Sequence, residues 1–561
     1  MQAQSGPLKG LNPTVTVIAS AVVLAFVIFG ATATETASTV FTTVKDAIIG
    51  GLKWYYIAVV AGFLFFVIYL MFSRFGHIRL GDDDDRPEFS RFSWFAMLFG
   101  AGMGIGLLFW SIAEPIYHFQ SNPFVTEATA ASTKAQIAMR LTFFHWGLHP
   151  WAIYVIVGLT LAYFHFRKKL PLTIRSSLYP LIGERIYGPI GHAADVLAVF
   201  GTIFGIATSL GLGVQQMTTG LFHITGWDVF VTPVLDEAGN QVMRDSGEPA
   251  VTGAIGTQLV LIAVISAVAT LSVVSGVGRG VRILSELNLW LTILMALFLI
   301  SFGPTAYLLQ FYLQSLGDYA QAVIPLSLWT DANGQSQWQS WWTAFYWGWW
   351  IAWAPFVGMF IARISKGRTI REFVLGVLLV PTVLAFLWLI LFGGTALHIQ
   401  LFGAGGISAA VQDDVTLALY QTLEAMNAGI AGYGAAIVAT VLLVTYFVTS
   451  SDSGTLVITT LLAAGDPEPP MVHRIVWGFG EGLVAAVLLL AGGLTALQTA
   501  SIAAALPFSI IMLAMIYGLI KALNEEVPPA RAHHLFHFRE GDDTPAAQTT
   551  TTTRSQEKKP T

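Results

Sequence analysis

The chain has 561 residues, of which 55% are hydrophobic and 11% are charged, and its mean hydropathy is +0.67. Soluble globular proteins carry roughly 25% charged residues, so this composition excludes an ordinary soluble domain and indicates an integral membrane protein. A formal net charge of −5 gives no indication of a nucleic-acid partner, and the absence of cysteine excludes disulfides and thiolate metal sites.

Apolar windows long enough to cross a bilayer recur along the chain. A helix needs roughly 20 residues to cross a hydrocarbon core of about 30 Å, and in lipid its backbone polar groups must be satisfied internally. The windows lie at residues 13–33, 54–73, 94–117, 137–164, 194–222, 253–274, 284–305, 340–364, 370–396, 434–462, 472–492 and 497–521. We therefore predict an all-α membrane protein with twelve transmembrane helices. No cleavable signal peptide is expected, so the first window should stay in the membrane.

The distribution of Lys and Arg predicts the orientation. These residues gather in alternate connections, at 74–93, 165–185 and 363–371. The other long connections are depleted: residues 306–337 and 397–433 contain no Lys or Arg, and residues 224–252 contain only Arg244. Because basic connections stay on the cytoplasmic side, both termini are expected in the cytoplasm.

Ionisable residues inside the windows are candidates for function, since charges at membrane depth are costly. They are Glu114, Arg140, His145, His149, Glu286, Asp452 and Glu481. They form no catalytic pattern. The pair His145 and His149 has i, i+4 spacing but lacks the HExxH glutamate and a third ligand, which disfavours zinc. Glu114 precedes Pro115, so the end of a helix near the outer surface explains it at least as well as proton transfer does.

Two stretches disturb helical regularity in the membrane. "FGAGMGIGLLFW" at 99–110 has four alternating glycines, which favour local unwinding or a close helix contact. "TYFVTSSDSG" at 445–454 supplies hydroxyl and carboxylate oxygens. Carbonyls freed in one helix and hydroxyls on another are suitable ligands for a hard cation such as sodium, and coupled transporters use discontinuous helices in this way.

The stretch "FYWGWWIAWAPF" at 345–356 places tryptophans deep in the eighth window. If that helix starts near Trp341, then Trp353 lies about 18 Å further along it, near or past the bilayer centre. An interfacial aromatic belt explains Trp338, Trp341 and Trp342 but not the deeper rings. Four tryptophans of this stretch can line one wall of a cavity: Trp347, Trp349, Trp350 and Trp353.

A second aromatic group occurs in "FFHWGLHPWAIY" at 143–154, where Trp146, Trp151 and Tyr154 flank Pro150. The proline is expected to bend the helix at their level. Two walls of indoles suggest an aromatic cage. Such cages bind quaternary ammonium groups through the electronegative ring faces, and a desolvated contact contributes about 2 kcal/mol or more.

At these residues the sequence resembles the betaine/choline/carnitine transporter family. The resemblance runs from about residue 13 to 523 and rests on "AGMGIG", "HWGLHPWAIY", "WWIAWAPFVGMFIARISKGRTIREF" and "VTSSDSG". It implies a leucine-transporter-like core of two inverted five-helix repeats, alternating access, a homotrimer and a place in the bacterial inner membrane. The implied division is a cytoplasmic tail at 1–12, two peripheral helices at 13–92, repeats at 93–305 and 338–523, an extracellular connection with an amphipathic helix at 306–337, and a disordered cytoplasmic tail at 524–561.

The resemblance also implies which residues bind substrate. It places an aromatic box at Trp146, Trp151, Tyr154, Trp349, Trp350 and Trp353, with Ala101, Met103 and Ser209 beside the substrate. Trp347 is expected near the approach to this box.

The sodium ligands that the resemblance implies form two sets. One ion is expected at Gly100, Met103, Tyr446, Thr449 and Ser450. A second would use Thr202 and Phe356, but Ile206 stands where the family has another threonine hydroxyl, so the second site is doubtful.

The implied function is sodium symport of glycine betaine or a related compatible solute, for osmoprotection. Residues 194–222 contain no arginine of the kind that replaces an ion in sodium-independent exchangers, and Gly106 stands where proton-coupled choline carriers have aspartate. The alternative is proton-coupled uptake of choline or of a sulfonium solute such as dimethylsulfoniopropionate. An enzyme or a sensor is disfavoured because neither an acid/base pair nor an output domain is visible. Osmotic regulation by the short C-terminal tail is a further hypothesis.

Overall fold

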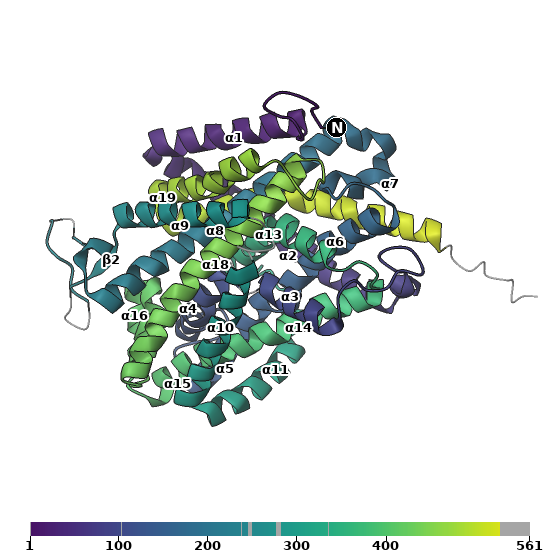
Figure 1. Cartoon of the computed structure of the whole chain (residues 1–561). Coiled ribbons are helices and arrows are strands. Elements are labelled where there is room, and N and C mark those ends of the chain that lie inside the picture. The colour runs from purple at the N-terminus through teal and green to yellow at the C-terminus, as the bar shows by residue number, and fades with distance from the viewer. Residues whose placement is uncertain are drawn as a thin grey trace, which may run out of the picture.

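The computed structural model describes residues 2–102, 104–236, 238–244, 249–275, 282–334 and 336–527. They form a helical bundle from which one antiparallel pair of short strands projects (Figure 1). The main elements are α1 (Pro13–Thr32), α2 (Thr34–Phe72), α3 (Arg91–Gly102), α4 (Ile105–Gln120), α5 (Ala131–Trp146), α6 (Leu148–Ala162), α7 (Tyr179–Ile182), α8 (Pro189–Thr225), β1 (Val231–Pro233), β2 (Val251–Gly253), α9 (Ile255–Ser275), α10 (Arg282–Phe302), α11 (Thr305–Ser327), α12 (Trp338–Trp341), α13 (Thr343–Arg363), α14 (Ile370–Leu389), α15 (Thr395–Phe402), α16 (Ile407–Asp413), α17 (Ala418–Ala425), α18 (Ile430–Leu462) and α19 (Met471–Glu526). Shorter 3₁₀ or π segments are η1 (Arg74–His77), η2 (Tyr163–Arg167), η3 (Ile174–Leu178), η4 (Gly183–Tyr187), η5 (Asp228–Phe230), η7 (Ile390–Gly394) and η8 (Val415–Leu417).

The predicted class, an all-α membrane protein, is confirmed. Within the described part of the chain, ten helical stretches are long and apolar enough to cross a membrane. The two last predicted spans lie in α19, which is kinked at Gly493, where φ is 54° and ψ is −131°. A positive φ of this kind is strained for any residue with a Cβ, so glycine marks the kink. The count of twelve spans, the inverted repeats and the segment boundaries stay predictions.

The second helix is longer than predicted. The apolar window begins at residue 54, yet α2 begins at Thr34 and runs unbroken to Phe72. Residues 34–53 are rich in threonine and include Lys45, Asp46 and Lys53, which lowers their hydropathy without breaking the helix. A hydropathy window finds the stretch that lipid can surround, whereas the helix itself continues beyond it.

The third predicted span is interrupted, as the glycine run suggested. Helix α3 ends at Gly102 and α4 begins at Ile105, with Gly104 in extended conformation at φ −164° and ψ −172°. The glycines also permit close packing, because a Cβ at Gly106 would overlap the ring of Trp349. Both interpretations of the glycine run therefore hold, at different residues.

The fourth predicted span is also broken, but not at the proline. Helix α5 ends at Trp146, Gly147 is non-helical at φ −91° and ψ −130°, and α6 begins at Leu148. Pro150 lies in the first turn of α6, where a missing N–H removes no helical hydrogen bond. The predicted bend at Pro150 was therefore wrong: the break is at Gly147.

Helix α13 occupies the centre of the bundle, where it packs against α6, α8 and α19 (Figure 1). In the most apolar window of Trp338–Arg363, 94% of the residues are buried, compared with 28% in the corresponding window of α10. The tryptophans of α13 therefore lie largely inside the protein, while α10 presents most of its surface to the surrounding medium.

Candidate functional site

A narrow cavity lies between α4, α6, α8 and α13, and the centre of a water-sized sphere can occupy about 40 Å³ of it. All six rings of the predicted aromatic box line it, together with Ser209. The remaining lining residues are Gly104, Gly106, Leu107, Pro150 and Ala385. The structure thus brings the two aromatic groups of the sequence, which lie some two hundred positions apart, to one cavity.

The rings meet at fixed angles. Trp349 and Trp350 stack with their centroids 4.8 Å apart and an interplanar angle of 11°, while Trp146 stands edge-on to Trp350 at 4.9 Å and 71°. Trp151 and Tyr154 form a second edge-to-face pair at 5.4 Å and 80°. These are favourable geometries for aromatic pairs, so the walls hold their shape without a ligand.

Hydrogen bonds fix the indole rings from behind. The N–H of Trp350 donates to the carbonyl oxygen of His145 at 3.0 Å, and that of Trp353 donates to the carbonyl oxygen of Gly205 at 2.7 Å. The N–H of Trp349 shares the Gly205 acceptor at 3.4 Å. Since buried indoles need an acceptor, this arrangement satisfies the N–H groups and leaves the apolar parts of the rings to line the cavity.

Gly205 is a site residue that the sequence did not single out. A Cβ there would lie 2.6 Å from Cδ1 of Trp353 and 3.2 Å from its backbone nitrogen. Glycine is therefore what allows α8 to approach α13 closely enough to accept both indole N–H groups. The signal was weak: Gly205 precedes Ser209 by one helical turn, which places both on the same face of α8.

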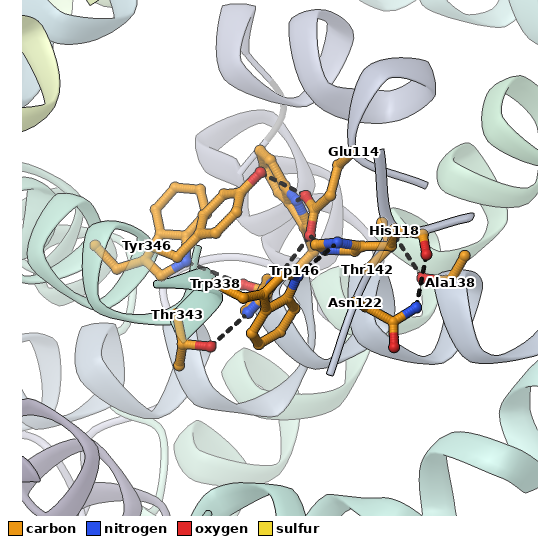
Figure 2. A network of polar contacts seen from close by, with 11 residues as sticks. Glu114, His118, Asn122, Ala138, Thr142, Trp146, Trp338, Thr343 and Tyr346 are labelled. Carbon is orange, nitrogen blue, oxygen red and sulfur yellow. Dashed lines mark hydrogen bonds and ion pairs between the residues drawn. The ribbon is translucent and has the colours of Figure 1, made fainter. Parts of the chain in front are cut away.

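Glu114 is the centre of a polar network next to the box (Figure 2). Its oxygen Oε2 accepts hydrogen bonds from the indole N–H of Trp146 at 2.7 Å and from the hydroxyl of Tyr346. Its oxygen Oε1 lies 2.7 Å from Nδ1 of His145 and 3.3 Å from Nε2 of His118. The expectation that Glu114 ends a helix was wrong, because α4 continues to Gln120 and the side chain is fully buried.

Glu114, His118 and His145 also present ligand atoms within 4.8 Å of one another, which suggests a metal site. The hydrogen bonds argue against it. The indole N–H of Trp338 can only donate, and it lies 3.3 Å from Nδ1 of His118. A neutral His118 then carries its proton on Nε2, directed at Glu114. A metal at Nε2 would leave this ring without any proton, whereas metal-bound histidines normally donate through the other nitrogen.

One neighbouring prediction needs correction. Trp347 does not line the cavity: it stacks on His149 at 5.1 Å, and His149 in turn contacts the Ser327 hydroxyl at 2.8 Å. Trp338 and Trp342 are partly buried and pack against His118, at 5.2 and 4.5 Å, and their place in an interfacial belt stays a prediction. Trp341, by contrast, is 52% exposed. Sequence depth alone could not separate inward from outward indoles.

The first predicted ion site is described in part. Gly100 and Ala101 lie in the last turn of α3, while Met103 lies outside the described residues. On α18, the hydroxyl of Thr449 accepts from Nδ2 of Asn288 at 3.0 Å. The Tyr446 hydroxyl lies 2.6 Å from that of Thr292, and Ser450 is half-buried beside them. The contacts of α18 with α10 at this level were not predicted.

The second predicted ion site lacks a side-chain oxygen at position 206. The hydroxyl of Thr202 donates to the carbonyl oxygen of Ala198 at 2.8 Å, and the ring of Phe356 packs edge-on against Trp353 at 5.5 Å. Ile206 is fully buried, with Cδ1 packed where a side chain at Gly454 would lie. An aliphatic side chain supplies no oxygen, so this position cannot contribute a ligand.

Known proteins resemble this chain over nearly its whole length. The family described as BCCT, betaine/carnitine/choline family transporter, matches residues 14–528. The probable glycine betaine transporter of Desulfitobacterium hafniense (strain Y51) is 46% identical over 519 residues, covering 92% of this chain and 98% of the relative. A glycine betaine transporter of Bacillus subtilis (strain 168) is 41% identical over 512 residues, covering 91% and 94%. A Vibrio parahaemolyticus protein named as a glycine betaine/proline/choline/ectoine transporter is 39% identical over 530 residues, covering 93% and 88%.

Proposed function

Because the chain belongs to the betaine/carnitine/choline transporter family, we propose that it imports glycine betaine or a related quaternary-ammonium compatible solute. Transport proceeds by sodium symport with alternating access across the bacterial inner membrane, and it serves osmoprotection. The observation that carries the proposal is the convergence of six aromatic rings, from α5, α6 and α13, on one cavity.

The rings suit the cationic end of such a solute. A trimethylammonium group has no N–H to donate, so it forms no hydrogen bonds with carboxylate or carbonyl acceptors, and electronegative ring faces suit it well. Trp146, Trp349 and Trp350 present three mutually oriented indoles to the same space, and their N–H groups already have acceptors. Desolvated contacts of this kind contribute about 2 kcal/mol or more.

The break in the third span suits the anionic end. Helix α4 begins at Ile105, and Gly104 and Gly106 line the cavity. The first N–H groups of a helix have no partner within the helix and carry the positive end of its dipole, so they favour a carboxylate. A substrate with its own carboxylate therefore fits this site, where Gly106 stands at the position at which proton-coupled choline carriers have aspartate.

For the coupling ion we propose sodium, held by oxygens of the broken third span and by the hydroxyls of Thr449 and Ser450. Support comes from the position of these hydroxyls on α18 and from the interruption between α3 and α4. A second ion at Thr202 and Phe356 lacks one ligand because of Ile206. We therefore propose that the first site alone is required for coupling.

The remaining properties are carried over from the family. We propose a homotrimer with both termini in the cytoplasm. The C-terminal tail beyond Val527 lies outside the described residues, so its regulatory role stays a hypothesis. A truncation that tests it should stop after Val527 rather than Leu523, because Glu526 accepts from the Tyr163 hydroxyl at 2.7 Å and pairs with Lys168 at 3.0 Å. Loss of hyperosmotic activation in that truncation would support a regulatory tail.

A competition panel tests the substrate assignment. Uptake of radiolabelled glycine betaine into proteoliposomes is challenged with unlabelled glycine betaine, choline, ectoine, proline betaine and dimethylsulfoniopropionate, with and without a sodium gradient. Strongest self-competition by betaine, dependent on sodium, supports the proposal. Stronger competition by choline or by the sulfonium solute, with uptake driven by a proton gradient alone, would favour the alternative transport mode.

A further inference from the structure

We propose that Glu114 is a specificity-determining residue of the aromatic box, because its buried carboxylate makes the box prefer a cation to a neutral group of the same shape. Glu114 is not among the residues that line the cavity. It acts through Trp146, which is. The inference rests on the proposed function, since it assumes that the box holds a trimethylammonium group.

The carboxylate is surrounded by donors from three helices. Figure 2 shows Trp146 reaching it from α5, Tyr346 from α13, and His118 from its own helix α4. His145, also from α5, contacts the same carboxylate through Nδ1. A carboxylate has about four lone-pair sites, so these contacts saturate it. Every partner is at most 6% exposed, and the carboxylate itself is fully buried.

The donors are suited to an anion. The indole N–H of Trp146 can only donate, and the contact of Trp338 with Nδ1 of His118 directs the remaining proton of that neutral ring toward Glu114. Hydrogen bonds to a carboxylate stabilise its charged form. Within the described part of the chain, Glu114 forms ion-pair contacts with His118 and His145 and with no lysine or arginine. His145 contacts the Thr343 hydroxyl at 3.0 Å through Nε2, which a neutral ring can accept.

The charge reaches the cavity through the Trp146 indole. Its N–H donates to Glu114 at 2.7 Å, while its ring forms part of the cavity wall and stands 4.9 Å from Trp350. Donation to an anion polarises the indole and increases the negative potential on its face, which strengthens its attraction for a cation. The low dielectric of the buried site also lets the carboxylate act directly over this short distance.

An analogue with a neutral head group separates the charge effect from a structural one. The compound tert-butylacetate has the shape of glycine betaine, but a quaternary carbon replaces the nitrogen, so it carries the carboxylate without the cation. Binding of both compounds to the purified full-length protein is measured by tryptophan fluorescence, in wild type and in Glu114→Gln. We expect the affinity for betaine to fall on the order of tenfold and that for tert-butylacetate to change far less. Equal losses for the two compounds, or no loss for betaine, would overturn the inference.

Tyr346→Phe supplies a second variant, which keeps the test decisive if Glu114→Gln does not fold. The Tyr346 hydroxyl shares Oε2 with the Trp146 N–H. Removing it leaves the charge in place and more of its hydrogen-bonding capacity for Trp146, so the preference for betaine over tert-butylacetate should be kept or increased. A reduced preference in this variant contradicts the inference. Failure of the wild type itself to bind betaine would instead contradict the proposed function.

Discussion

The indole N–H of Trp353 donates to the backbone carbonyl of Gly205 at 2.7 Å, and this bond ties α13 to α8 at the wall of the cavity. The same carbonyl accepts from Trp349 at 3.4 Å. One backbone group therefore positions two rings of the box, and its position depends on the missing side chain of Gly205.

Gly205→Ala is expected to weaken betaine binding by about tenfold or more, because the added Cβ would lie 2.6 Å from Cδ1 of Trp353 and must displace that ring. The measurement is the Kd of the purified variant from fluorescence titration. Gly62→Ala is the matched control, since a Cβ there meets nothing within 4 Å. An unchanged Kd in Gly205→Ala would show that the position of Trp353 does not matter for binding.

Trp350→Ala should reduce betaine affinity by roughly 30-fold, which corresponds to the loss of a desolvated cation–π contact of about 2 kcal/mol. Trp347→Phe is the informative comparison. Trp347 is as deeply buried but stacks on His149 away from the cavity, so this change should lower thermal stability while leaving Kd unaltered. If the two variants lose affinity equally, the loss reflects packing and the cage interpretation fails.

Gly147→Ala should lower the melting temperature strongly, since a Cβ would lie 2.6 Å from the carbonyl oxygen of Phe143 and 2.7 Å from both Phe386 and Tyr319. Overpacking of this kind costs about 1–3 kcal/mol. Pro150→Ala should have a much smaller effect, because Pro150 lies in the first turn of α6 and breaks no hydrogen bond. Thermal unfolding in detergent compares the two. A larger loss of melting temperature in Pro150→Ala than in Gly147→Ala would indicate that the proline, and not the glycine, determines the local structure.

Ile206→Thr tests the doubtful second ion site. The substitution places a hydroxyl one helical turn from that of Thr202, so it should raise the Hill coefficient for sodium in betaine uptake if the rest of the site is intact. Some loss of stability is expected, because the Cδ1 packing against Gly454 disappears. A Hill coefficient identical to that of the wild type, in a folded variant, would show that more than this ligand is missing.

The sequence predicted the elements that depend on local pattern. Apolar windows located the membrane helices, and the glycine run located the break between α3 and α4. The two aromatic motifs were also sufficient to predict which rings would line one cavity, because their resemblance to a known family is specific. These signals are read along one stretch of chain at a time.

What the sequence could not show depends on contacts between distant stretches. The donors to Glu114 include Tyr346, which lies 232 positions further along the chain. The residues next to Glu114 in the sequence therefore could not show that its carboxylate accepts hydrogen bonds inside the bundle. Inward and outward tryptophans of one helix differ only in what packs against them, as Trp347 and Trp350 demonstrate. Gly147 breaks its helix where a proline nearby gave the stronger local signal.

The central claim, sodium-driven import of a trimethylammonium zwitterion, is tested most directly by initial rates of radiolabelled glycine betaine uptake into proteoliposomes of the purified protein. Internal and external pH are equal. Uptake is measured with an inward sodium gradient and again with the sodium replaced by potassium, in buffers without choline. We expect rapid uptake with the gradient and a rate near that of empty liposomes without it. Uptake at full rate in the absence of sodium would contradict the claim.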